Sequence, residues 1–144
     1  MISDKIDVVR ISKWDSYVST LQRRLSVVFG VREFLTMEEK VGDITYRILS
    51  FDMEVLGEKC HCKVYSKKTV KPYYVVGIFV YTDTPVDSSV IQASMSRLYM
   101  IAHESAKLSG TFVGEVEFSK KYVSTEEVFK TKARELIQAM RENF

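Results

Sequence analysis

The chain has 144 residues, of which 46% are hydrophobic and 28% are charged, and its formal net charge is +2 at pH 7. This length predicts a single domain, residues 1–144, and the near-neutral charge excludes a strong overall attraction to nucleic acid or anionic membranes. The N-terminus lacks the apolar core of a secretory signal, and no stretch reaches the roughly 20 apolar residues that span a bilayer, so we expect no membrane association.

The first predicted element is an amphipathic helix from about Lys13 to Phe29. Its apolar residues recur every three or four positions, which places them on one stripe of a helix. They are Trp14, Tyr17, Val18, Leu21, Leu25, Val28 and Phe29. Gly30 is typical of a helix end, because glycine tolerates the left-handed conformation needed there. Residues 31–43 carry a weaker pattern, which we interpret as a short strand over 31–35 and a turn over 37–41.

Three strands follow, at 44–56, 59–67 and 73–82, and their short connections predict an antiparallel meander. Within 44–56 the apolar residues change from even to odd numbers after Ile48, which we interpret as an inserted bulge residue. Strand 73–82 is apolar on both faces. We therefore expect it at the centre of the sheet, with Gly77 marking a close approach by a neighbour.

A long helix over about residues 84–108 comes next. It is apolar on more than one stripe, so we expect it to bury one side in the core and another against a second copy of the chain, with Met95 and Tyr99 as the interface residues. A strand over 111–118 and an amphipathic helix over 125–142 complete the chain. The order helix, three-strand antiparallel meander, helix, strand, helix predicts an α+β domain with helices packed on a curved sheet.

The strand over 59–67 alternates without a break, and alternate side chains of a strand point to opposite faces. Cys60 and Cys62 are expected in the core, while the other face is expected in water. That face and its continuation supply the candidate nucleic-acid-binding residues Lys59, His61, Lys63, Tyr65, Lys67, Lys68 and Lys71. Lysines spaced along a strand can contact successive phosphates, and an aromatic ring among them can stack on a base. The alternative is a solvated sheet face whose lysines discourage aggregation.

We predict no catalytic or metal-binding residue and no cofactor. The thiols of Cys60 and Cys62 share one strand face while His61 points away, which does not suit a tetrahedral zinc site. The chain has no phosphate-binding loop, dinucleotide fingerprint or nucleophile elbow. Buried free thiols are typical of a reducing compartment such as the cytoplasm, and the scarcity of Asn and Gln is typical of a thermophilic source.

The order of elements resembles two known groups of proteins. Asp52 and Glu54 precede His61 and Lys63. This placement of acids before a lysine resembles the core of restriction-endonuclease-like nucleases, in which acids and a lysine hold Mg²⁺ and activate water. His61 stands where that family has an acid, so this resemblance implies a degenerate nuclease fold. The same order also resembles the type III secretion chaperones, which implies a dimer formed through the helix after the third strand and an apolar groove for a partner peptide.

These observations favour a non-catalytic module that binds a protein partner or associates with itself as a homodimer. The observation behind this expectation is the apolar excess of the helix over 84–108. A nucleic-acid-binding module that uses the basic strand, and a degenerate nuclease, are the alternatives. The sequence leaves the partner and the biological process open.

Overall fold

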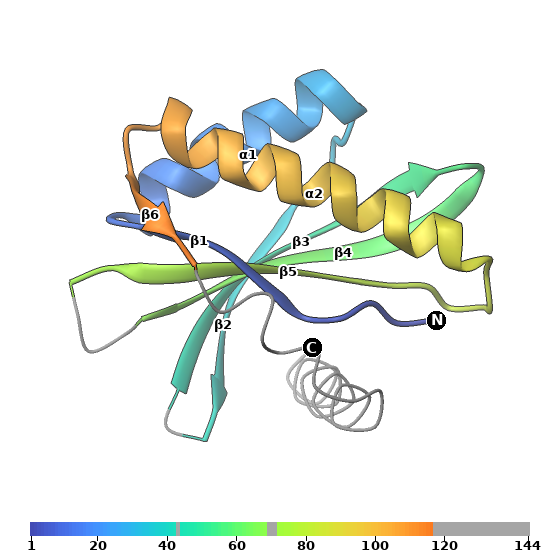
Figure 1. The fold of residues 1–144 in the computed structure, drawn as a ribbon, viewed down its shortest axis with the longest axis horizontal. Coiled ribbons are helices and arrows are strands. Elements are labelled where there is room, and N and C mark those ends of the chain that lie inside the picture. The colour runs from blue at the N-terminus through green and yellow to red at the C-terminus, as the bar shows by residue number, and fades with distance from the viewer. Residues whose placement is uncertain (43, 69–71, 117–144) are drawn as a thin grey trace.

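A computed structural model describes residues 1–42, 44–68 and 72–116 of the chain. Within these residues six strands form one antiparallel sheet, and two helices lie on the same side of it (Figure 1). The elements in chain order are β1 (Ile6–Ile11), α1 (Trp14–Phe29), β2 (Leu35–Val41), β3 (Ile44–Val55), β4 (Glu58–Lys68), β5 (Tyr74–Tyr81), α2 (Ser88–Leu108) and β6 (Phe112–Glu115). Across the sheet the strands are ordered β2-β3-β4-β5-β1-β6. The α+β class agrees with the sequence analysis.

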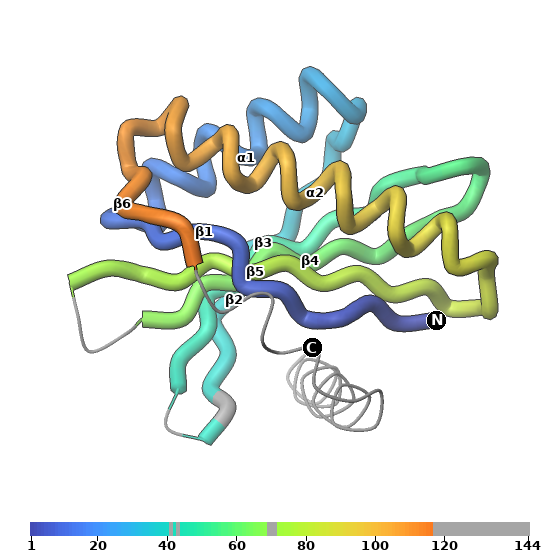
Figure 2. Tube along the Cα trace, viewed as in Figure 1, coloured from blue at the N-terminus to red at the C-terminus, as the bar shows by residue number. Residues whose placement is uncertain are grey.

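The predicted order helix, three-strand antiparallel meander, helix, strand, helix is wrong. β1 precedes the first helix and is absent from the predicted elements, and residues 35–41 form a strand instead of a turn. β1 lies between β5 and β6 (Figure 2), and β2 pairs along its whole length with β3. The meander therefore has four strands, β2 to β5, with the first strand of the chain added beside the last of them. The predicted helix over 125–142 lies outside the described residues.

β3 pairs with β2 and β4 in unbroken register, so the predicted bulge is also wrong. The apolar residues change face because this part of the sheet is buried on both sides, and a strand covered on both faces needs no alternation. Leu49 and Phe51 lie in the core under the helices. Tyr46 and Ile48 lie in a second apolar cluster on the opposite side.

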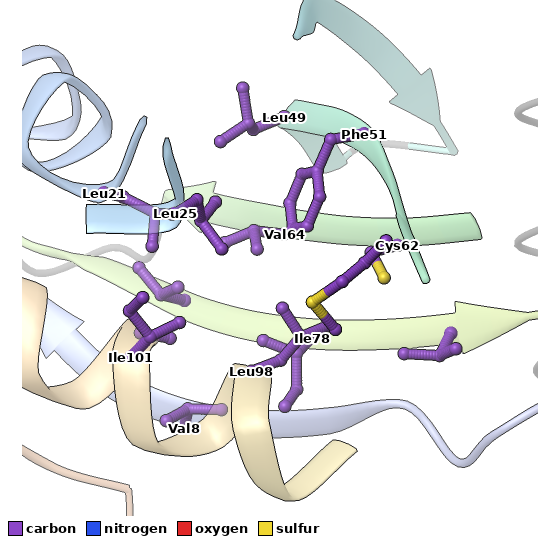
Figure 3. Close-up of a cluster of buried hydrophobic side chains, with 14 of the residues drawn as sticks. Val8, Leu21, Leu25, Leu49, Phe51, Cys62, Val64, Ile78, Leu98 and Ile101 are labelled. Atoms are coloured by element: carbon purple, nitrogen blue, oxygen red, sulfur yellow. The ribbon is translucent and has the colours of Figure 1, made fainter. Parts of the chain in front are cut away.

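The main core lies between the two helices and the sheet (Figure 3). Leu21 from α1, Leu98 from α2 and Ile78 from β5 all belong to this core, and each is fully buried. Cys60 and Cys62 are fully buried in the same core, as predicted. Neither α1 nor α2, the helices of the described residues, combines the length and apolar character needed to cross a membrane.

Local signals explain the helix ends and the hairpin that position the candidate sites. α1 ends at Gly30, which has φ 67° and donates its backbone N–H to carbonyls of the last turn. α2 begins at Ser88 because the Asp87 carboxylate accepts the backbone N–H of Ser89. Between β3 and β4 the two turn residues, Leu56 and Gly57, both have positive φ (52° and 78°), which suits a tight hairpin with right-handed twist.

Candidate functional site

Side chains of β3, β4 and β5 that point away from the helices form what we call the distal face of the sheet. Cross-strand pairing aligns these residues in rows, because directly opposed residues of neighbouring strands point to the same side. The face comprises Tyr46, Ile48, Ser50 and Asp52 from β3, His61, Lys63, Tyr65 and Lys67 from β4, and Gly77, Phe79 and Tyr81 from β5. Most of the predicted nucleic-acid-binding residues therefore share one surface.

His61 lies between two carboxylates. Its Nδ1 is 2.6 Å from Oδ1 of Asp52, its directly opposed partner on β3, and its Nε2 is 2.8 Å from Oδ2 of Asp83 beyond β5. Burial lowers the pKa of His61, but the hydrogen bonds and charges of Asp83 and Asp52 outweigh burial, so the pKa lies above its ordinary value. An imidazolium that donates to both carboxylates links β3 and β4 to the segment that follows β5.

Lys63 is a buried lysine with a polar partner. It is 8% exposed, and its Nζ donates to Oγ of Ser50 at 2.6 Å, again between directly opposed residues. Burial lowers the pKa of Lys63, while the negative charge of Asp52 acts in the opposite direction. The two side chains border a depression of about 560 Å³. Its lining residues are Gly30, Arg32, Glu33, Phe34, Leu35, Ser50, Phe51, Asp52, His61 and Lys63.

The other end of the distal face is aromatic and tightly packed. Tyr65 is fully buried, and its ring occupies the space that a side chain at Gly77 would fill, which explains the predicted close approach. Its hydroxyl donates to Oδ1 of Asp7 on β1 at 3.0 Å, and Nζ of Lys67 donates to Oδ2 of the same carboxylate at 3.1 Å. Nζ of Lys5 lies over the Tyr65 ring, 4.9 Å from its centroid. Both oxygens of Asp7 are therefore engaged.

The basic strand thus does not present a continuous row of cations. Lys59 and Lys68, at opposite ends of β4, are exposed, whereas Lys63 and Tyr65 are buried. Lys59 lies 3.5 Å from Asp52, and its side chain is 69% exposed. Lys71 lies outside the described residues. Nucleic-acid binding stays a prediction.

Two acids of the described residues, Glu33 and Asp52, line the same depression as Lys63. Asp52 is the acid whose charge acts on Lys63, and its own carboxylate is engaged by His61 and Lys59. No group of three His, Cys, Asp or Glu side chains able to hold a metal ion occurs among the described residues. The nuclease interpretation stays a prediction without a described metal site.

The outer side of α2 forms a second candidate surface. Met95, a predicted interface residue, is 9% exposed and packs in the main core. Tyr99, the other one, is 46% exposed, and Met100 and Leu108 farther along the helix are 55% and 58% exposed. Phe112, the first residue of β6, is 38% exposed and lies beside the same helix, with Nζ of Lys107 5.4 Å from its ring centroid.

His103 lies at the centre of this surface. Its ring stacks on that of Tyr99, with the ring centroids 6.1 Å apart and an interplanar angle of 22°, and its centroid also lies 5.6 Å from that of Phe112. Its Nε2 is 3.3 Å from Oε1 of Glu115 but is not aligned for a hydrogen bond. Beside it, Oε1 of Glu104 accepts a 2.7 Å hydrogen bond from Arg24 of α1.

We call this region the α2–β6 surface. It comprises Tyr99, Met100, His103, Glu104, Lys107, Leu108, Phe112 and Glu115. Six of these residues border a depression of about 460 Å³. Met100, Leu108 and Phe112, which are exposed here, were not among the predicted interface residues. Helical spacing could have found the first two, since Met100 and Leu108 lie eight positions apart on one side of the helix.

The Asp52, His61 and Asp83 cluster was also absent from the predicted sites. A signal for its first pair exists in the sequence: a two-residue turn at Leu56-Gly57 sets a register in which Asp52 faces His61. Asp83 offers no such signal, because its place depends on how β5 pairs with β4. The chain matches no protein-family model, no curated protein and no solved structure.

Proposed function

We propose that this protein is a non-catalytic binding module that associates with itself as a homodimer through the α2–β6 surface. The observation that carries the proposal is the exposure of Tyr99, Met100 and Leu108 along the part of α2 that lies near the exposed ring of Phe112. Exposed apolar side chains that adjoin one another, rimmed by charged groups, are typical of protein-binding surfaces.

The distal face supports a module without catalysis of its own. Its titratable groups are engaged within the chain: His61 lies between two carboxylates, Lys63 donates to the hydroxyl of Ser50, and Lys67 donates to Asp7. Groups bonded in this way stabilise the sheet, because each forms a hydrogen bond with a polar group that would otherwise be buried without one.

We also propose a reducing compartment, the cytoplasm, as the place where the protein works. Cys60 and Cys62 are free and buried, and they face the helices instead of the solvent. Burial raises the pKa of the Cys62 thiol well above its ordinary value, which keeps it in the unreactive protonated form. Thiols of this kind suit a compartment in which disulfides do not form.

Sedimentation equilibrium of the full chain at micromolar concentration tests the homodimer. We expect a dimer for the natural chain and a shift toward monomer for Met100→Glu. The dissociation constant should rise by about tenfold or more, because an unpaired charge in the interface costs at least about 1.4 kcal/mol. Val27→Glu is the matched control, since Val27 is an exposed apolar residue on α1, outside the α2–β6 surface, at 78% exposure. A natural chain that sediments as a monomer at every concentration overturns the proposal.

A further inference from the structure

β3 is longer than the strand that pairs with it on its outer side. β2 pairs with β3 from Ile44 to Ser50, and β3 then continues alongside β4 as far as Val55. The β3–β4 hairpin therefore extends past the start of β2 (Figure 1). Among the described residues no strand pairs with the outer side of β3 over residues 51–55. We call these five residues the β3 edge, because here β3 is an edge strand.

The turn at the end of the hairpin determines which backbone groups of the β3 edge point outward. Val55 and Glu58 flank a two-residue turn, and residues that flank such a turn exchange backbone hydrogen bonds with each other. Hydrogen-bonded and non-hydrogen-bonded pairs alternate along an antiparallel ladder, so Met53 also bonds to β4. The backbone N–H and C=O groups of Asp52 and Glu54 are therefore directed away from β4, toward the outer side.

The segment that leads into β2 leaves a hollow beside this edge. Residues 31–34 belong to no strand. The depression of about 560 Å³ is lined by parts of this segment and Leu35, and by Ser50, Phe51 and Asp52 of β3. Its volume lies within the range of roughly 300–1,000 Å³ that is typical of ligand pockets. An extended chain that continued the line of β2 along β3 would enter this depression.

We propose that the β3 edge binds an extended peptide of a partner protein, antiparallel to β3, with a basic residue opposite Asp52, another opposite Glu54 and an apolar residue between them. This site is separate from the α2–β6 surface, and the inference does not depend on the homodimer. In strand addition the backbone hydrogen bonds provide affinity, and alternate side chains of the peptide provide specificity.

The charges of the hairpin favour basic residues in the peptide. On β4 the residues directly opposite Asp52 and Glu54 are His61 and Lys59, so an acidic row already lies beside a basic row. A strand added on the other side would place its side chains about 4.5–5.5 Å from the same two acids, where opposite charges stabilise and like charges destabilise. Asp52 is already engaged by His61, so we expect the exposed carboxylate of Glu54 to contribute more.

The middle residue of the peptide would lie on the side of the sheet that carries the helices. It would oppose Met53, which is 3% exposed and belongs to the main core. Phe51, on the same side of β3, packs against Phe34 with the ring centroids 5.9 Å apart. A charged side chain in this apolar setting would lose water without gaining a partner, so the proposal requires an apolar residue at this position.

A synthetic peptide of seven residues that alternates lysine and valine, with blocked ends, tests the proposal on the full chain. Isothermal titration calorimetry should show binding, and the same peptide with glutamate in place of lysine should bind at least about tenfold more weakly. Methylation of the lysine backbone nitrogens should abolish binding, because these N–H groups would face β3. Methylation of the valine backbone nitrogens should not, because these point away from it.

Two proline variants locate the site. Glu54→Pro removes an outward N–H and leaves the hydrogen bonds between β3 and β4 in place, so the hairpin should persist while peptide binding is lost. Glu38→Pro is the matched control on β2, the outermost strand at this end of the described sheet. Glu38 opposes Arg47, whose backbone groups bond to β4, so the N–H of Glu38 also points outward. Circular dichroism and urea unfolding establish that both variants fold.

Glu54→Lys reverses the charge without using proline, and it decides the proposal together with the methylated peptides if Glu54→Pro does not fold. We expect this variant to lose the lysine peptide and to prefer the glutamate peptide. Binding of the lysine peptide by the natural chain and by Glu38→Pro, but not by Glu54→Pro or Glu54→Lys, supports the site.

Three results overturn the proposal. The first is that the natural chain binds no lysine peptide at concentrations up to about 1 mM. The second is that Glu38→Pro abolishes binding while Glu54→Pro retains it, which would place the peptide on the outer edge of β2. The third is unchanged binding of the lysine peptide by Glu54→Lys. None of these results bears on the homodimer, which sedimentation of the natural chain tests separately.

Discussion

The distal face and the α2–β6 surface both combine aromatic rings with titratable groups, but they differ in how far those rings are buried. On the distal face Tyr65 is fully buried and its hydroxyl donates to Asp7. On the α2–β6 surface Tyr99 and Phe112 keep much of their area exposed. The comparison teaches that residue type does not distinguish a packing surface from a binding surface. What distinguishes them is whether the same chain already supplies the contacts.

Truncating one aromatic ring on each surface should give the largest contrast. Phe79→Ala removes a fully buried ring of the distal face, so we expect a loss of about 3–5 kcal/mol in the free energy of unfolding. Tyr99→Ala, by contrast, should change the stability of the separated chain by less than about 1 kcal/mol while weakening self-association. Urea unfolding and sedimentation of both variants measure the two effects. Similar stability losses would erase the distinction between the surfaces.

Adding a methyl group to the distal face is the next largest test. A side chain at Gly77 would overlap the ring of Tyr65, so Gly77→Ala should destabilise the chain by about 1–3 kcal/mol. Gly114→Ala on β6 is the control, because its added Cβ would come no nearer than 4.0 Å to a neighbouring side chain, that of Arg10. Urea unfolding of the two variants compares them. Equal effects would show that Tyr65 does not need the space above Gly77.

A smaller effect should follow pH through His61. Its pKa is raised above 6.5 in the folded chain, so the stabilisation is fully present below the unfolded value and is lost as pH rises through the folded pKa. Asp52→Asn combined with Asp83→Asn removes both carboxylates and should flatten this part of the pH profile. His61→Gln serves as the reference without a titrating group. Thermal unfolding from pH 6 upward measures the slope, and a profile unchanged by the double substitution would contradict the role of the two acids.

The smallest expected effect concerns nucleic acid. A fully exposed basic strand would make about five phosphate contacts, whereas its exposed ends, Lys59 and Lys68, allow about two. Any binding to duplex DNA should therefore have a slope of about −2 in a plot of log affinity against log salt. Lys59→Ala with Lys68→Ala should remove that dependence, and Lys63→Ala should not. Fluorescence anisotropy measures both, and a slope near −5 would mean that the distal face opens to present its buried lysine.

Several features of the fold could be predicted because they are local. Apolar residues at helical spacing located α1, and a terminal glycine with a left-handed conformation located its end. Unbroken alternation from Lys59 to Lys67 predicted β4 and the burial of both thiols. The apolar run over 73–82 predicted a central strand, and β5 lies between β4 and β1. Each signal lies within one segment, where side-chain direction follows backbone geometry.

The sequence by itself determined which side chains of each strand share a face, since that follows from the two-residue period of the backbone. Only the tertiary structure decided that the face carrying Lys63 and Tyr65 is buried while the outer side of α2 is exposed. It also decided that β1 lies beside β5. The physical reason is that burial depends on contacts between segments distant in sequence. The carboxylate of Asp7 binds both Tyr65 and Lys67 from nearly sixty positions away in the sequence. The alternation of residues within β4 does not indicate this contact.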